Sequence, residues 1–240
     1  MPGNPDGRAG ILPVPPLRQI LDVLEAFHGA QAPGWPTDPY LFLVWWHCGY
    51  PPSEERCARG FDCLSRQIGV TPEQLLSAPS ARLARALEAG GMVPAVRATR
   101  LREIAKCVRD NYAGNLRAAL QRLPLPGSRA ALKQFPGIGN PGADRILLFG
   151  GIAPVAAIPS ACPHVLVRIE SGREPERYTA TYAQAQRILA AQAGGAVDTL
   201  TRAYLLLQCH GRSLCKRSKP KCSACPVADS CAYFARMGVA

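Results

Sequence analysis

The segment CKRSKPKCSACPVADSC, near the carboxyl end, constrains the fold of this chain more than any other feature. Its cysteines, separated by six, two and five residues, are Cys215, Cys222, Cys225 and Cys231. Four thiolates so close in sequence can ligate one iron–sulfur cluster, and four thiolates also suit a structural zinc ion. Zinc sites commonly use two short-spaced pairs, whereas this segment has a single C-x2-C pair. The spacing therefore favours iron–sulfur and leaves zinc as the alternative.

The cysteine content of the chain also bears on its compartment. The chain has 10 cysteines, and its start, MPGNPDGRAGILPVPP, lacks the basic-then-apolar pattern of a secretory signal. No uncharged apolar run reaches the length of about eighteen residues that a membrane span needs. Because the cytoplasm keeps thiols reduced, metal ligation is a better expectation than a disulfide framework. We expect a cytoplasmic protein with no membrane partner.

The charge balance points to a polyanionic partner. The formal net charge is +11 at pH 7, and a field of that sign attracts nucleic acid. Most of the basic residues are Arg, and GC-rich coding also enriches a sequence in Arg, so the charge alone does not decide the question.

Helical periodicity dominates the sequence, and strand-like alternation is nearly absent. An amphipathic stretch covers residues 17–27, and helical segments follow one another over 40–122, one of them opening on Thr71 and Pro72. Gly- and Pro-rich breaks then divide the chain into shorter helices, at 123–128, 150–154, 171–176 and 193–197. We expect an all-α protein.

The segment LKQFPGIGNPGADRILLFGG predicts a helix end, a tight turn and a helix start. Gly137 and Gly139 allow the backbone conformations of a tight turn. Asn140 and Pro141 suit the N-cap and the first position of the following helix. Backbone N–H groups at such a start suit a DNA phosphate, although many turns of this kind merely connect two helices.

The two motifs together resemble the endonuclease III branch of the helix-hairpin-helix DNA glycosylases. The cysteine spacing, preceded by a His-Gly-Arg at 210–212, is similar to the family's [4Fe-4S] loop, and FPGIGxxxA is similar to its LPGVGxxTA hairpin. The resemblance covers roughly residues 20–235. It implies an all-α, two-lobed fold, with a helical barrel domain over 40–149 that carries the hairpin and an iron–sulfur cluster domain formed by 1–39 plus 150–240. It also implies a [4Fe-4S] cluster on the four cysteines and monomeric binding of double-stranded DNA, damaged or abasic DNA included.

The resemblance further implies which residues contact DNA. His47 matches the residue that fills the hole left by a flipped base, and the alternative is a buried, satisfied histidine. Met92 matches an apolar wedge that enters the base stack, and the alternative is a plain interhelical turn. The other DNA contacts come from the hairpin and the cluster loop, at Gly137, Ile138, Gly139, Asn140, Lys216, Arg217, Lys219 and Lys221.

Members of this family remove a base with a lysine nucleophile and an aspartate, and both are replaced in this chain. Pro141 stands at the lysine position and Pro159 at the aspartate position, while a rival register places Cys162 there instead. Asp144 is a candidate substitute for the catalytic acid, but an ordinary charge near a helix start explains it more simply. Glu170 is interpreted as an ion-pair partner of Arg168.

Three hypotheses for the function remain. The first is a repair-family DNA-binding protein with no lyase activity through a lysine and little or no glycosylase activity. The second is a monofunctional glycosylase with a displaced acid or an unusual substrate. The third is a zinc-bound interaction module with no DNA role.

Overall fold

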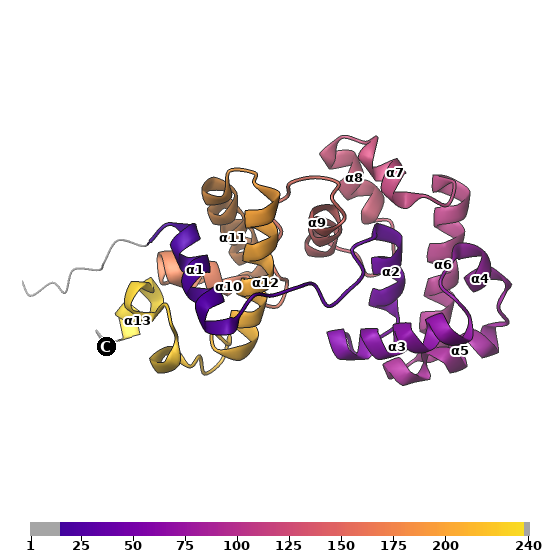
Figure 1. Cartoon of the computed structure of the whole chain (residues 1–240), viewed down its shortest axis with the longest axis horizontal. Helices are drawn as coiled ribbons and strands as arrows, with labels where there is room; N and C mark the ends of the chain where they lie inside the picture. The colour runs from indigo at the N-terminus through magenta and orange to yellow at the C-terminus, as the bar shows by residue number, and fades with distance from the viewer. Residues whose placement is uncertain (1–14, 238–240) are drawn as a thin grey trace, which may run out of the picture. The chain divides into compact units, whose positions relative to one another are not determined.

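A computed structural model describes residues 15–237 of the chain. Within this range the protein is built from helices and contains no β-strand, only an isolated bridge between Tyr50 and Gly91. The all-α class expected from the sequence is confirmed. The helices form two compact units (Figure 1), unit 1 within Met1–Gln31 and Ile158–Ala240, and unit 2 within Ala32–Ala157.

Unit 2 contains eight of the helices and surrounds the longest one, α6. In Figure 1, α6 runs along α4 and α5 on one side, and it also contacts α2 and α7. The helices of unit 2 are α2 Pro39–His47, α3 Glu54–Gln67, α4 Pro72–Ser77, α5 Ser80–Leu87, α6 Pro94–Tyr112, α7 Leu116–Gln121, α8 Leu125–Leu132 and α9 Asn140–Phe149.

Local capping explains where several of these helices begin. The side chain of Asp38 accepts hydrogen bonds from the Tyr40 and Leu41 N–H groups at the start of α2. At α4, Thr71 and Gln74 form a capping box, with Pro72 in the first turn as the sequence indicated. These contacts satisfy N–H groups that the helix itself leaves without partners.

An aromatic cluster lies between α2 and α9 in the core of unit 2. The guanidinium of Arg145, on α9, lies 3.6 Å from the centre of the Trp35 ring, a cation–π distance. Trp35 also packs against Trp45, with ring centres 6.4 Å apart, and against Phe149, at 5.2 Å. This cluster joins the segment before α2 to α9.

Unit 1 combines the first described helix with the carboxyl-terminal third. The helices α1 Leu17–His28, α10 His164–Ser171, α11 Tyr178–Ala193, α12 Val197–Ser213 and α13 Ala232–Met237 make up the unit. In Figure 1, α1 lies along α12, and α10 contacts α11, α12 and α13.

The boundaries between the two units differ from the domain boundaries expected from the sequence. Residues 32–39 and 150–157 belong to unit 2, whereas the sequence analysis grouped them with the cluster domain. Packing explains the difference, because Trp35 is buried against Phe149 and the Arg117 guanidinium donates to the Gly150 carbonyl. No helix in the described range is both long and apolar enough to cross a membrane.

Candidate iron–sulfur centre and nucleic-acid interface

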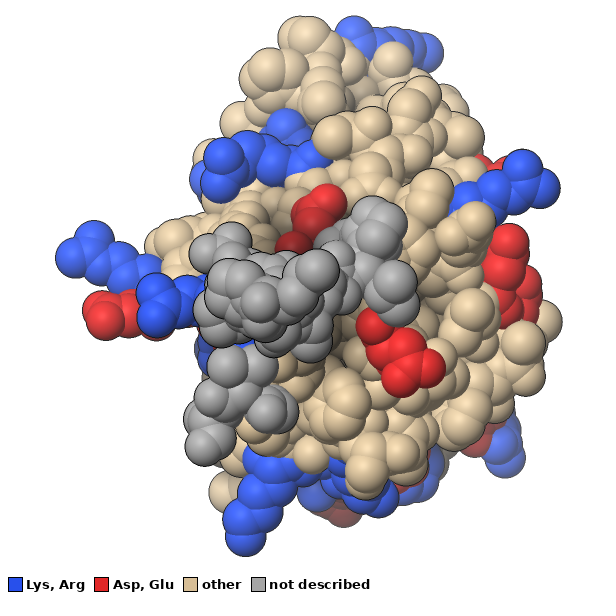
Figure 2. Space-filling view, turned by 90° about the vertical axis from the view of Figure 1, so that its left-hand side faces the viewer, with Lys and Arg blue, Asp and Glu red and all other residues tan. Residues whose placement is uncertain are grey.

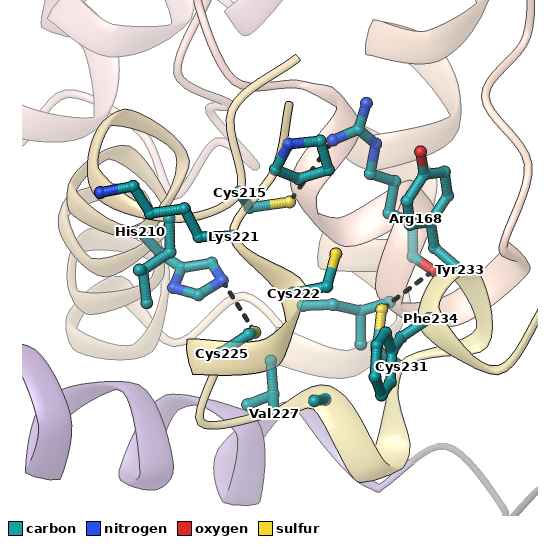
Figure 3. A pocket seen from close by; sticks show the side chains of 14 residues that line it. Arg168, His210, Cys215, Lys221, Cys222, Cys225, Val227, Cys231, Tyr233 and Phe234 are labelled. Atoms are coloured by element: carbon teal, nitrogen blue, oxygen red, sulfur yellow. Dashed lines mark hydrogen bonds between the residues drawn. The ribbon is translucent and has the colours of Figure 1, made fainter. Parts of the chain in front are cut away.

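The four clustered cysteines line one pocket in unit 1 (Figure 3). Cys215 follows the end of α12, and Cys222 opens a short 3-10 turn, Cys222–Ala224. Cys225 ends that turn, and Cys231 precedes α13. Hydrogen bonds fold the loop back on itself, since the Lys221 N–H donates to the Leu214 carbonyl at 3.0 Å. The loop thus turns sulfur atoms from separate elements toward a shared space.

Arg168, on α10, is the main polar contact of this loop. It is 3% exposed, and its Nη1 donates to the Lys216 carbonyl at 2.8 Å and lies 3.8 Å from the Cys215 Sγ. Its Nη2 donates to the Arg217 carbonyl at 3.0 Å. The same guanidinium pairs with Glu174, through Nε at 2.6 Å. One buried cation therefore fixes the start of the cysteine loop.

The expected ion pair between Arg168 and Glu170 is wrong. Glu170 instead accepts a hydrogen bond from the Gln192 side chain at 2.9 Å. Residues two apart on a helix do not face one another, so a partner beyond the helix end, Glu174, reaches Arg168 in place of Glu170.

Two histidines form a polar path from the surface of unit 1 to the pocket. His210 is 1% exposed, and its Nε2 lies 3.6 Å from the Cys225 Sγ. Its Nδ1 lies 3.1 Å from the Nε2 of His28, which is half-buried. Burial lowers the pKa of His210 to about 4, so the ring is neutral near pH 7 and carries one N–H. That N–H can donate to the sulfur while His28 donates to Nδ1.

The pocket suits an iron–sulfur cluster in the chemistry of its donor set. Among the described residues that line it, the four cysteines are accompanied by apolar side chains, by His210 and Tyr233 and by the cationic Arg168 and Lys221, and not by carboxylates. Burial raises the pKa of Cys215 to about 11, while Arg168 acts to lower it. A cluster binds thiolates, and nearby cations favour that charged form. The residues present therefore fit the group.

The basic residues between these cysteines are solvent-exposed. Lys216, Arg217, Lys219 and Lys221 are all exposed, and Lys219 has a left-handed backbone, with φ +54°. Figure 2 shows that on the face viewed there, Lys and Arg side chains stand in separate groups with Asp and Glu between them. On the part of that face that the grey atoms leave visible, the basic side chains therefore form no single continuous patch.

The hairpin turn lies in unit 2, between α8 and α9. Gly137 and Gly139 are exposed, and Gly137 has φ +69°, a conformation that favours glycine. Helix α9 begins at Asn140 with Gly139 as the N-cap, one residue earlier than the sequence indicated. Ile138 between them is buried, at 7% exposed.

Pro141 and Pro159 stand where the sequence analysis expects the family's lysine and aspartate. Pro141 is in the first turn of α9. Asp144 is 2% exposed, and its Oδ1 accepts from Arg129 Nε at 2.7 Å. Pro159 is buried. Cys162 is packed so tightly on Gly211 that a Cβ added there would lie 2.5 Å from its Sγ, and burial raises its pKa to about 11.

His47 lies directly beneath the hairpin. It is 5% exposed, and its Nε2 donates to the Pro136 carbonyl at 2.9 Å. A Cβ added at Gly137 would lie 3.7 Å from the His47 ring. This geometry matches the alternative of a buried, satisfied histidine, and a contact between His47 and DNA stays a prediction.

Met92 lies on an exposed loop next to the segment that follows α2. It is 62% exposed. The Tyr50 N–H donates to the Gly90 carbonyl at 3.0 Å, and the Met92 N–H donates to the Tyr50 carbonyl at 2.9 Å. The structure thus brings His47, the hairpin and the Met92 loop into one connected part of unit 2.

Sequence reasoning missed the residue that holds this loop, Arg97. It is 2% exposed, and its guanidinium donates to four backbone carbonyls, at 2.6 to 2.9 Å, those of Cys48, Leu87, Gly91 and Met92. A signal was present, because Arg97 shares the apolar face of α6 with Leu101 and Ile104. A charged residue at a core position of the helical repeat indicates a buried polar network.

Comparisons with known proteins agree with these motifs. Residues 215–231 match the family model described as the iron–sulfur binding domain of endonuclease III. The chain is 28% identical to endonuclease III of Rickettsia conorii over 170 residues, 68% of this chain and 70% of that protein. It is 27% identical to the thymine-DNA glycosylase of Aeropyrum pernix over 142 residues, 58% of each protein.

Solved structures share the fold over nearly the whole chain. A non-covalent endonuclease III–DNA complex aligns with a TM-score of 0.70 and 16% identity, covering 93% of this chain and 97% of that one. A thermostable thymine-DNA glycosylase aligns with a TM-score of 0.71 and 19% identity, covering 92% and 97%. These likenesses confirm the two-lobed helix-hairpin-helix fold. The chain is therefore similar in sequence and fold to the endonuclease III-like helix-hairpin-helix DNA glycosylases, and its residues 215–231 match the iron–sulfur binding domain of endonuclease III, which supports a [4Fe-4S] cluster.

Proposed function

We propose that this protein binds double-stranded DNA, damaged or abasic duplexes included, as a monomer and with little or no base-removing activity. The hairpin of unit 2 and the cluster loop of unit 1 supply the contacts, and Cys215, Cys222, Cys225 and Cys231 ligate the [4Fe-4S] cluster. The names of the relatives support the repair context, and one structural neighbour is an endonuclease III bound to DNA.

The proposed lack of catalysis rests on two residues in the first turns of α9, Pro141 and Asp144. Pro141 has no amine, so it cannot form a Schiff base with the sugar. Asp144, the nearest acid in the helix, is buried and paired with Arg129. A carboxylate that is buried and hydrogen-bonded to a guanidinium is poorly placed to contact a substrate.

DNA binding is tested by fluorescence anisotropy at low and at physiological salt. We expect submicromolar binding to an abasic-analogue duplex at low salt, with an affinity that falls as salt rises. The double variant Lys216→Ala/Lys219→Ala is expected to weaken binding to every duplex about equally, because phosphate contacts carry no sequence information. A matched control is Lys106→Ala, an exposed lysine on α6. A protein that ignores all duplexes at low salt overturns the proposed function.

The absence of lyase chemistry is tested by borohydride trapping on abasic DNA. We expect no covalent adduct from the wild type, because Pro141 offers no amine. Endonuclease III serves as the positive control. An adduct formed in high yield by the wild type contradicts the proposal.

Base removal is tested separately, on duplexes that carry uracil, oxidised pyrimidines, alkylated purines or mismatches. We expect no release of base above background. A burst of release that Asp144→Asn abolishes would establish the rival hypothesis, a monofunctional glycosylase with a displaced acid, in place of the proposal.

A further inference from the structure

We propose that His28 is a positioning residue for the iron–sulfur cluster. It fixes the tautomer of His210, so that the Nε2–H of that ring donates to the Cys225 sulfur and makes the cluster easier to reduce. The inference rests on the proposed ligation of the [4Fe-4S] cluster by Cys225 and does not depend on DNA binding. Hydrogen bonds to the ligand sulfurs are one of the features that set the reduction potential of such a cluster.

His210 lies between the two groups that it connects, and both of its ring nitrogens are in contact. Its Nε2 lies 3.6 Å from the Cys225 Sγ, and its Nδ1 lies 3.1 Å from the Nε2 of His28. Figure 3 shows the His210 ring reaching from α12 toward Cys225, at the pocket that the four cysteines line. The three side chains therefore form a continuous path from the half-buried His28 to the sulfur.

The chemistry of the sulfur decides which nitrogen of His210 carries the proton. The buried ring is neutral near pH 7, and a neutral imidazole has one N–H and one acceptor nitrogen. A cysteine sulfur that ligates iron is a thiolate and has no proton to donate. The His210 Nε2 must therefore be the donor, because the other tautomer would set a lone pair against the sulfur in a buried site.

His28 supplies the contact that selects this tautomer. With the His210 proton on Nε2, the Nδ1 is an acceptor, and the Nε2–H of His28 donates to it. A group that holds the far nitrogen of a histidine in this way fixes both its tautomer and the orientation of its ring. Without that donor, His210 is free to carry its proton on Nδ1 and to leave the sulfur without a hydrogen bond.

Helix α1 is held on α12 by contacts that do not involve the cysteine loop. Arg202 of α12 pairs with Asp22 at 2.8 Å and, through Nε, with Glu25 at 3.0 Å. Asp22 and Glu25 lie one to two turns before His28 on α1, and Arg202 lies about two turns before His210 on α12. These ion pairs set the register in which the two histidines meet, although 182 positions separate them in the chain.

The direction of the effect follows from the charge that reduction adds. A reduced cluster and its sulfur ligands carry one more negative charge, and a hydrogen-bond donor stabilises that charge. Loss of the His210 donor therefore favours the oxidised form and makes the reduction potential more negative.

The test measures the reduction potential of the full-length holoprotein by protein-film voltammetry, for variants that keep the iron content of the wild type. His210→Leu and His28→Leu are each expected to shift the potential to a more negative value. The double variant is expected to shift it no further than His210→Leu does, because His28 acts through His210. His28→Gln, whose amide can still donate to Nδ1, is expected to restore the potential of the wild type.

The matched control is Phe27→Leu, since Phe27 lies beside His28 on α1 and is 53% exposed. It is expected to leave the potential unchanged. His28→Phe keeps a ring without an N–H, and it replaces His28→Leu in the comparison if the leucine variant loses iron. A His28→Leu or His28→Phe variant with full iron content and the potential of the wild type overturns the inference, as does a His28→Gln variant that matches His210→Leu. Full iron content in Cys225→Ala would instead overturn the proposed ligation.

Discussion

Arg97 Nη1 donates to the Cys48 carbonyl oxygen at 2.6 Å and so joins the start of α6 to the end of α2. Within residues 15–237, no acid pairs with this buried guanidinium, and carbonyl dipoles stabilise its charge instead. Arg97 therefore both holds the Met92 loop and contributes to the stability of unit 2.

Arg97→Met is expected to lower the free energy of unfolding of unit 2 by at least about 3 kcal/mol, because several buried carbonyls lose a charged donor at once. All three tryptophans of the chain, Trp35, Trp45 and Trp46, lie in unit 2. Tryptophan fluorescence during urea denaturation therefore reports on this unit alone. Arg100→Met, an exposed neighbour on the same helix, is expected to change stability by about 0.5 kcal/mol or less. Equal effects of the two substitutions would contradict the assignment.

Removal of any one cluster cysteine is expected to lower iron content and visible absorbance, since a [4Fe-4S] cluster needs four ligands. The variants are Cys215→Ala, Cys222→Ala, Cys225→Ala and Cys231→Ala, measured by iron analysis and absorption spectroscopy after anaerobic purification. Cys209→Ala is the matched control, because Cys209 lies on α12 but does not line the pocket. If Cys209→Ala lost as much iron as the four variants, the ligand assignment would fail.

Local motifs are the part of this protein that its sequence predicts well. The cysteine spacing, the glycine turn and the capping pair at Thr71 and Pro72 each depend on residues close in the chain, and the structure shows the turn and the cap within a residue of their expected places. The helix start at Asn140 differs by one position because Gly139 takes the N-cap, a common uncertainty at helix ends.

Contacts between distant residues could not be predicted in this way. His28 and His210 are 182 positions apart, and Arg97 and Cys48 are 49 apart. Nothing in helical periodicity pairs such residues, because periodicity specifies which face of a helix is buried but not what covers it.

Arg168→Lys is expected to speed the loss of the cluster in air by several-fold while leaving the protein folded. Lysine keeps the charge but lacks the planar fork that contacts the Cys215 sulfur and two loop carbonyls together. The decay of visible absorbance in air-saturated buffer measures the effect. Arg173→Lys, an exposed residue after the same helix, is the control. Identical decay of the two variants and the wild type would show that Arg168 does not position the loop.

His47 is expected to make unit 2 less stable as the pH falls. Burial is the main cause that lowers the pKa of His47 from 6.5 to about 4, so between those values the unfolded chain binds a proton that the folded chain does not. Stability from this group is therefore fully present above about pH 6.5 and falls by about 3 kcal/mol on reaching pH 4. Urea denaturation followed by tryptophan fluorescence measures this in unit 2, without interference from acid loss of the cluster.

The matched variant for this titration is His47→Gln, which can still donate a hydrogen bond to the Pro136 carbonyl but does not titrate. Its stability at pH 7 is expected to be lower, because the replacement packs less well in a buried site. Its stability is expected to fall less steeply than that of the wild type from pH 7 to pH 4. Parallel curves for the two proteins would mean that His47 has the same pKa in the folded and the unfolded protein, and would contradict the prediction.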